Sequence, residues 1–190
     1  MENTGERQIP SIPGTLEGLD PKHVQRYEFA SAIVRGKKVF DVACGTGYGK
    51  LLLQARKYYG FDISAETIEY ARQYYSGDNS EFLVADASSM SDEYSKAEAI
   101  VSFETIEHLQ DPGNFLDWCA RHTDLLIISS PIRGSFPISR FHLFEYRLVK
   151  FQLALEGRYS KVNMFIQNNG SICYPCLPGD RGVAIAICQR

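Results

Sequence analysis

Hydrophobic positions along the chain alternate between two spacings, and this alternation predicts a series of strands and helices. Short runs rich in consecutive apolar residues are typical of buried strands. They occur at residues 37–42, 57–62, 81–86, 98–103 and 124–130. Between them apolar residues recur every three or four positions, the spacing of an amphipathic helix. We expect such helices at about 21–36, 48–55, 64–75 and 112–122.

Residues that favour helix ends support these boundaries. Asp20 followed by Pro21 is typical of an N-cap with proline at the first helical position, and Gly36 ends that helix. Ser64 is a second expected N-cap. In the last quarter of the chain, residues 145–156 predict a further helix. Two more apolar stretches, 161–167 and 182–189, can complete a sheet.

Strands that alternate with helices imply an α/β fold whose sheet is mainly parallel and covered on both faces. Residues 1–19 contain several glycines and prolines with little periodicity, so we expect an irregular N-terminal arm. In sheets of this kind, ligands bind beyond the carboxyl ends of the strands. The stretch VFDVACGTGYG, residues 39–49, begins within the first predicted strand and continues past its carboxyl end.

Three interpretations of this glycine-rich stretch compete. It can be a tight strand-to-helix turn, a dinucleotide site or a site for S-adenosylmethionine. A dinucleotide site needs a third glycine where this chain has Lys50, and Asp41 would repel a phosphate. S-adenosylmethionine carries an ammonium and a sulfonium group and no phosphate. An acidic residue at the entrance of the loop suits that cation.

The next two strands also end at acidic residues. Asp62 ends the second strand, where a carboxylate can accept hydrogen bonds from both hydroxyls of a ribose. Asp86 ends the third strand. One aspartate at a strand end is most often a turn residue. Three in succession are difficult to explain as turn residues and favour a ligand site.

Several motifs resemble one family. Residues 39–49 resemble the first motif of class I S-adenosylmethionine-dependent methyltransferases, and SFETIEHLQDP (102–112), with E-x-x-E-H, resembles small bacterial-type members. TGERQIP near the start and HVQRYEFA (23–30) resemble their leading arm and helix. The resemblance covers nearly the whole chain. It implies one domain over 1–190 and a Rossmann-like three-layer sandwich. Its seven-stranded, mostly parallel sheet would have an antiparallel last strand.

The resemblance also implies the cofactor and its contacts. The cofactor would be S-adenosylmethionine, and in the family the acidic residue at the position of Asp86 meets the adenine amino group. The expected cofactor-binding residues are Asp41, Ala43, Gly45, Gly47, Tyr48, Asp62, Ile63, Asp86, Ala87 and Phe103.

The expected activity is transfer of a methyl group to an oxygen or nitrogen of a small-molecule acceptor. A hydroxyl acceptor needs a base, and histidine suits that role near neutral pH. His108, after the fourth strand, is the predicted catalytic residue, with His142 as second choice. Two alternatives stay open. One is a non-catalytic, cofactor-binding partner of another protein. The other is metal-assisted methylation of the terminal 2′-oxygen of RNA.

We predict no metal in the site. The question nevertheless stays open, because oxygen and nitrogen side chains in this region could hold a divalent ion. These are Glu104, Glu107, His108 and His142. The resemblance supports both outcomes. In ubiquinone-pathway O-methyltransferases and small-RNA methyltransferases, a metal on E-x-x-E-H can orient the acceptor, whereas in many other relatives the same letters only cap a helix.

The charge and the apolar content of the chain indicate which kinds of partner to expect. A formal net charge of -3 without a basic run makes nucleic acid an unlikely partner, because phosphate contacts require Lys or Arg. No apolar run approaches the roughly 18–20 residues that span a bilayer, so we expect no membrane contact. The N-terminus has no apolar core of the signal-peptide type, and we expect a cytoplasmic protein.

Overall fold

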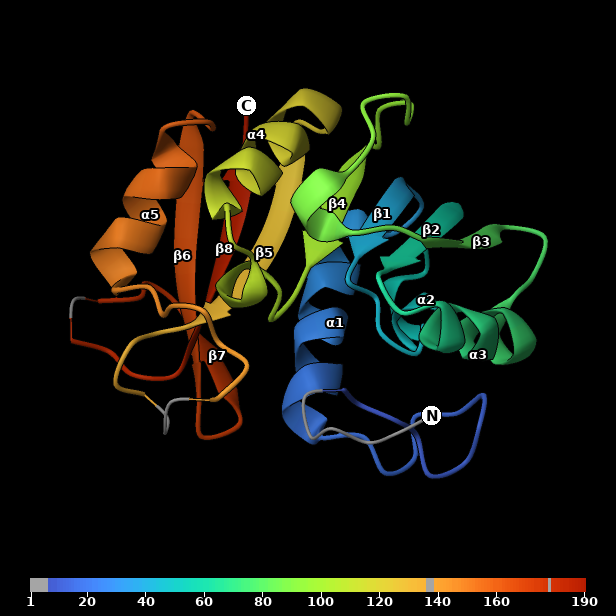
Figure 1. Ribbon diagram of the computed structural model, residues 1–190. Helices are drawn as coiled ribbons and strands as arrows, with labels where there is room; N and C mark the ends of the chain where they lie inside the picture. The colour runs from blue at the N-terminus through green and yellow to red at the C-terminus, as the bar shows by residue number, and fades with distance from the viewer. Residues whose placement is uncertain (1–6, 136–138, 178) are drawn as a thin grey trace. The chain divides into compact units, whose positions relative to one another are not determined.

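The computed structural model describes residues 7–135, 139–177 and 179–190 (Figure 1). Its helices and strands, with η for a single 3-10 turn, follow in chain order. They are α1 (Pro21–Val34), β1 (Lys38–Val42), α2 (Gly49–Leu53), β2 (Lys57–Asp62), α3 (Ala65–Tyr75), β3 (Ser80–Val84), η1 (Ala87–Ser89), β4 (Ala99–Ser102), η2 (Ile106–His108), α4 (Pro112–His122), β5 (Leu125–Pro131), α5 (Leu148–Glu156), β6 (Lys161–Asn168), β7 (Ser171–Cys173) and β8 (Val183–Gln189).

The chain forms two compact units. The first comprises Met1–Ala87 and Ala97–Val101, and the second comprises Ser88–Lys96 and Ser102–Arg190. The expectation of a single domain over 1–190 stays a prediction. The first six residues of the expected arm lie outside the described residues.

The first unit is built on parallel strands. β1 pairs with both β2 and β4, and β2 pairs with β3, which gives the order β3-β2-β1-β4. Helix α3 packs against β2 and β3, as Figure 1 shows, and α1 packs against α2. Because parallel strands end at the same edge of a sheet, the loops after β1, β2 and β3 share one edge.

The second unit is built on antiparallel strands, in the order β5-β8-β6-β7. The antiparallel last strand is confirmed as β8, and α5 packs against β6 and β8. The described residues contain eight strands, one more than the seven expected, because β7 forms a short hairpin with β6. Asn169 and Gly170 join them with φ of 48° and 78°. An Asn-Gly pair is a strong hairpin signal that the sequence already carried.

The predicted helix starts are confirmed by their caps. The Asp20 carboxylate accepts a hydrogen bond from the Lys22 N–H at 2.8 Å, and the Ser64 hydroxyl accepts one from the Thr67 N–H at 3.3 Å. Each satisfies an N–H group that the first helical turn leaves without an internal partner. Among the described residues, no helix has the length and apolar character needed to cross a membrane.

The largest boundary difference concerns α5, which begins at Leu148 and not at residue 145. Tyr146 forms an isolated parallel bridge with Ile132, and its carbonyl accepts a hydrogen bond from the Arg133 N–H at 2.8 Å. This bridge holds the chain extended just before the helix. The helical spacing of apolar residues therefore begins before the helix itself, because tertiary contacts keep residues 145–147 out of it.

Candidate functional site

The loop between β1 and α2 carries backbone angles that most residues avoid. Ala43, Gly45 and Gly47 have φ of 62°, 56° and 89°. A Cβ at Gly47 would lie 2.8 Å from atoms of both Ala71 and Phe82, whereas one at Gly45 would meet no described atom within 4 Å. Gly47 is thus required by packing as well as by its φ. The open space beside Gly45 is available to a ligand.

Asp41 lies at the base of this loop and is fully buried. The Tyr58 hydroxyl donates to its Oδ2 at 2.7 Å, and the Tyr27 hydroxyl donates to its Oδ1 at 3.2 Å. Burial raises the pKa of the Asp41 carboxyl to about 7, against the opposing effect of these two hydrogen bonds. A Cβ at Gly49 would lie 2.7 Å from Asp41 Oδ2 and would clash with Tyr27. The last glycine of the motif therefore makes room for this buried cluster.

Asp62, the last residue of β2, has a carboxylate that the backbone holds in place. Its Oδ2 accepts from the Gly45 N–H at 3.0 Å, and its Oδ1 accepts from the Ser64 N–H at 2.9 Å. Each oxygen keeps acceptor capacity beyond these bonds. The carboxylate is therefore oriented toward the glycine loop and can bind two further donors, as a ribose would provide.

The other predicted cofactor residues of the first unit have different environments. Ile63 follows Asp62 with 65% of its surface exposed, so an apolar side chain stands open beside the carboxylate. Asp86 and Ala87 follow β3 and are half-buried. Tyr48 is buried, and its ring packs edge-on against Tyr27 with centroids 5.2 Å apart. A cofactor contact of Tyr48 stays a prediction.

The second unit contains the remaining candidates, which follow β4. Phe103 is buried. Glu104 has a φ of 50°, and its N–H donates to the Ser129 hydroxyl oxygen at 3.1 Å. That hydroxyl donates in turn to Glu104 Oε1 at 3.0 Å. Ser129, which is part of β5, therefore holds Glu104 in place.

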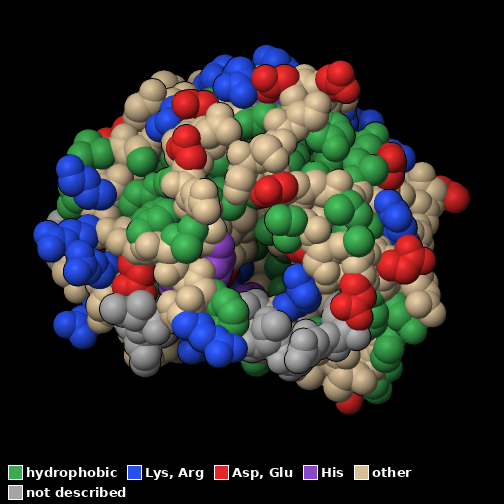
Figure 2. Space-filling model, in the orientation of Figure 1, with side chains coloured by type: hydrophobic (Ala, Val, Ile, Leu, Met, Phe, Trp, Pro, Cys, Tyr) green, Lys and Arg blue, Asp and Glu red, His purple; other side chains and the backbone are tan. Residues whose placement is uncertain are grey.

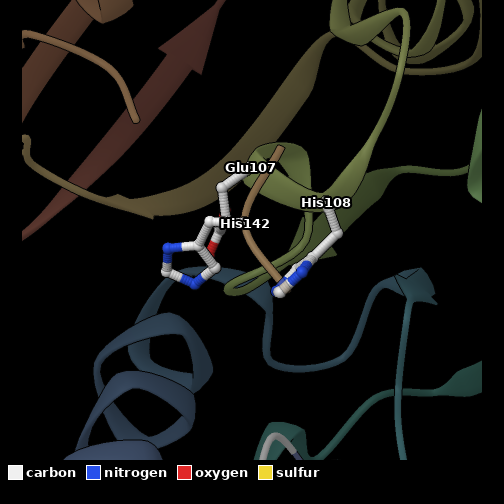
Figure 3. A group of neighbouring side chains, drawn as sticks. All are labelled: Glu107, His108 and His142. Atoms are coloured by element: carbon white, nitrogen blue, oxygen red, sulfur yellow. The ribbon is translucent and has the colours of Figure 1, made fainter. Parts of the chain in front are cut away.

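Glu107, His108 and His142 form a cluster (Figure 3). One oxygen or nitrogen of each lies within 4.8 Å of those of the other two. Glu107 and His108 project from the η2 turn, and His142 comes from the segment before α5. The Leu143 N–H donates to the Glu107 carbonyl at 3.0 Å and joins the two segments. Of the four residues considered for a metal, these three come together and Glu104 is not part of the group.

A backbone contact indicates which nitrogen of His108 carries the proton. Its Nδ1 lies 3.0 Å from the Phe141 carbonyl oxygen. Because a carbonyl oxygen can only accept, Nδ1 carries the proton in this contact. The lone pair of the neutral ring then resides on Nε2, the form that a general base or a metal ligand requires. His142 packs edge-on against this ring, with centroids 5.0 Å apart, and its Nδ1 lies 3.7 Å from Glu145 Oε1.

The cluster fits a divalent ion in its chemistry. One carboxylate and two imidazoles are a donor set suited to a first-row transition metal. Glu107 is fully buried, and both histidines are half-buried.

Sequence reasoning missed two kinds of contact in the site. Tyr58 lies within the second predicted strand, and its residue type does not reveal that its hydroxyl makes the shorter hydrogen bond to Asp41. The Phe141 carbonyl was not considered, because a backbone group leaves no trace in the residue types. The positions of Asp62, at the end of a predicted apolar strand, and of His108, a few residues after another, were in contrast visible in the sequence.

Residues 39–124, from β1 to the end of α4, match the family described as "Methyltransferase domain". A probable S-adenosylmethionine-dependent methyltransferase of Mycolicibacterium smegmatis is 28% identical over 170 residues, which cover 80% of this chain and 63% of the relative. The chain thus spans less than two thirds of the length of that curated relative.

Solved structures share the fold. The small RNA methyltransferase HEN1 aligns with a TM-score of 0.73 at 19% identity, over 88% of this chain and 25% of that one. Magnesium protoporphyrin IX methyltransferase of Synechocystis PCC 6803, with bound SAH, aligns with a TM-score of 0.64 at 17% identity, over 88% and 84%. This confirms the α/β Rossmann-like methyltransferase fold, mostly parallel with antiparallel C-terminal strands. Residues 39–124 of the chain thus match a methyltransferase domain, and the chain is similar to probable S-adenosylmethionine-dependent methyltransferases.

Proposed function

We propose that this chain binds S-adenosylmethionine and transfers its methyl group to an oxygen or nitrogen of a small-molecule acceptor. The observation that carries the proposal is the Asp62 carboxylate, which the Gly45 and Ser64 N–H groups orient toward the open side of the glycine loop. A carboxylate held in this way binds the two ribose hydroxyls through charge-assisted hydrogen bonds.

Other residues of the first unit support the cofactor. Ile63 offers exposed apolar surface beside Asp62 for the adenine ring. Asp86, just after β3, is the proposed acceptor for the adenine amino group. Asp41 is too buried for a direct contact, and its ionised form would favour the cationic methionine end through the intervening loop. A phosphate cofactor would gain nothing from these three acids.

In the proposed reaction the methyl carbon is already activated by the positive sulfur. The protein must hold the acceptor atom about 3 Å from that carbon, in line with the departing sulfur. For a hydroxyl acceptor, we propose that His108 Nε2 takes the proton as the carbon–oxygen bond forms. The fixed tautomer of His108 supports this role. The transferred proton leaves a positive imidazole, which the nearby Glu107 carboxylate would stabilise.

Calorimetric titration with S-adenosylmethionine, S-adenosylhomocysteine and NADH tests the cofactor. We expect saturable binding of the two sulfur compounds and no heat from NADH. Binding without turnover on any acceptor would favour a non-catalytic, cofactor-binding partner. The absence of binding heat with both sulfur compounds would refute the proposal.

A second candidate is metal-assisted methylation of a terminal 2′-oxygen of RNA. The Glu107, His108 and His142 cluster favours it, because these side chains could hold a divalent ion. A bound ion would supply Lewis-acid activation of the acceptor hydroxyl. The charge of the chain opposes an RNA acceptor. The formal net charge is -3, and Figure 2 shows acidic and basic side chains interspersed on the face it presents. We therefore keep a small molecule as the first proposal.

A further inference from the structure

The N-terminal arm, residues 7–19, is an ordered part of the first unit although it contains no helix or strand. The Ser11 N–H donates to the Glu17 carbonyl at 2.7 Å and closes a loop within the arm. The Tyr75 hydroxyl donates to the Thr15 carbonyl at 3.2 Å and fixes this loop to α3. Leu19 is buried at the end of the arm. The arm is therefore held in a defined position by polar and apolar contacts.

The beginning of the arm contacts the glycine loop. The Thr46 hydroxyl, between the two loop glycines, donates to the Gln8 carbonyl at 3.0 Å. Thr46 is fully buried. The Gln8 side-chain oxygen accepts from the Asp20 N–H at 2.9 Å, which connects this point to the start of α1. Gln8 thus joins the glycine loop to the first helix, and it fixes where the preceding residue can lie.

That preceding residue is Arg7, which faces the Asp62 carboxylate. Arg7 Nη2 lies 3.7 Å from Asp62 Oδ1, with the Arg7 side chain 25% exposed and that of Asp62 only 9% exposed. This distance is too long for a hydrogen bond, so the pair is an ion pair. The Ser64 N–H already uses one side of Oδ1. The guanidinium therefore lies beside an oxygen that already accepts one hydrogen bond.

A ribose on Asp62 needs acceptor capacity on that same oxygen. Two adjacent hydroxyls bind a carboxylate bidentately only if each oxygen has a free acceptor position. The Gly45 and Ser64 N–H groups each use one acceptor position, one on each oxygen, and Arg7 Nη2 lies 3.7 Å from Oδ1. We therefore expect Arg7 and a ribose hydroxyl to compete for the space beside Oδ1.

We propose that Arg7 is a placeholder for the cofactor ribose: its guanidinium pairs with Asp62 in the ligand-free chain and leaves when the cofactor binds. The inference rests on the proposed function, since it takes Asp62 as the ribose-binding residue. The ion pair keeps the carboxylate compensated while no ligand is present. The ion pair also lowers the affinity for the cofactor, because part of the binding free energy is used to separate the pair.

The first test is the affinity of Arg7→Met for S-adenosylhomocysteine by calorimetry. This probe has no net charge, so loss of a distant positive charge hardly affects its binding. We expect tighter binding by about two- to fivefold, the range of a partly exposed ion pair. Arg7→Lys, which keeps the charge, should bind as the wild type does. Arg56→Met is the matched control, because Arg56 pairs with Glu98 elsewhere in the same unit.

Thermal unfolding provides a second readout. Because the pair exists only in the ligand-free chain, Arg7→Met should lower Tm without ligand and leave Tm unchanged at saturating S-adenosylhomocysteine. A Tm difference that persists in the complex would overturn the placeholder role. So would unchanged or weaker binding by Arg7→Met, since weaker binding would make Arg7 a cofactor ligand. If the wild type fails to bind S-adenosylhomocysteine, the proposed function fails first and this inference with it.

Discussion

At the scale of single residues, the environment of Asp41 departs most from what an acidic residue in a glycine motif suggests. It is buried beneath the loop and held by two tyrosine hydroxyls. Burial disfavours its ionised form more than the two hydrogen bonds favour it, so the pKa of its carboxyl is raised. The folded chain therefore binds a proton at Asp41 at a pH where the unfolded chain has lost it.

This difference predicts a pH-dependent stability. The pKa of Asp41 is about 7 in the folded chain, against an ordinary value of 3.8. The contribution of the protonated Asp41 carboxyl to the free energy of unfolding is fully present below about pH 4. It is lost as pH rises to 7, by up to about 1.4 kcal/mol per pH unit. Urea denaturation at about pH 5 and about pH 8 measures it. Asp41→Asn should lose less stability than the wild type over this range. Parallel losses in the two proteins would contradict the shifted pKa.

At the scale of elements, the turn that follows β2 does two jobs. Ser64 caps α3 through its hydroxyl, and its N–H orients the Asp62 carboxylate. The Gly45 N–H supplies the second hydrogen bond from the neighbouring loop, because β1 and β2 are parallel and end at one edge. Two elements together thus fix one side chain, and the β2–α3 turn is expected to determine cofactor affinity.

Asp62→Ala tests this turn. We expect S-adenosylhomocysteine binding to weaken on the order of 2–4 kcal/mol, because a pair of charge-assisted hydrogen bonds is lost. Calorimetry at several ligand concentrations measures the change. Asp78→Ala, an exposed aspartate in the same unit, is the control and should bind as the wild type does. Unchanged affinity in Asp62→Ala would place the ribose elsewhere.

A substitution in the η2 turn is expected to affect turnover and not cofactor affinity. His108→Ala should keep its affinity for S-adenosylhomocysteine within about twofold and lose turnover by a factor of about 100 or more, the range of general-base catalysis. Release of S-adenosylhomocysteine with a panel of small alcohols and amines measures turnover. Equal loss of affinity and turnover would show that the histidine is structural.

The same assay tests whether a metal takes part in the reaction. With His108 as a base and no metal, EDTA should leave the wild-type turnover unchanged. Loss of activity on chelation, with recovery on adding Mn²⁺, would instead support the metal site of Glu107, His108 and His142. His142→Ala should then no longer respond to Mn²⁺.

At the scale of the whole molecule, charge decides which acceptors are plausible. The formal net charge is -3, with 20 basic and 23 acidic residues. RNA binding depends on cationic contacts to phosphates and the counterions that they release. In the view of Figure 2, basic side chains gather along the left edge, and elsewhere acidic and basic side chains are mixed. We therefore expect a macromolecular polyanion to bind this chain weakly.

Fluorescence anisotropy with a labelled single-stranded RNA tests this expectation. At about 150 mM salt, where non-specific contacts are weak, we expect a dissociation constant above about 100 μM. S-adenosylhomocysteine should not tighten it. Submicromolar binding under these conditions would favour the RNA candidate over a small molecule.

Much of the architecture was readable from local patterns. Alternating strands and helices gave the α/β class, and Asp20 and Ser64 marked helix starts correctly. These features follow from residues close in sequence, since hydrophobic spacing and caps act within a few positions. The missed β7 hairpin had a local signal too, in Asn169-Gly170, whereas the start of α5 did not. The start of α5 is set by the bridge between Ile132 and Tyr146, two residues that are not close in sequence.

The sequence by itself determined which side chains stand at the ends of the parallel strands. An apolar run followed by an acid is a local pattern, and the topology brings such ends to one edge. Only the tertiary structure decided what surrounds them: the tyrosines on Asp41, the arginine on Asp62 and the carbonyl that sets the His108 tautomer. Each of these partners comes from a distant segment. Contacts of that kind arise when the folded chain brings those segments together, and no local pattern records them.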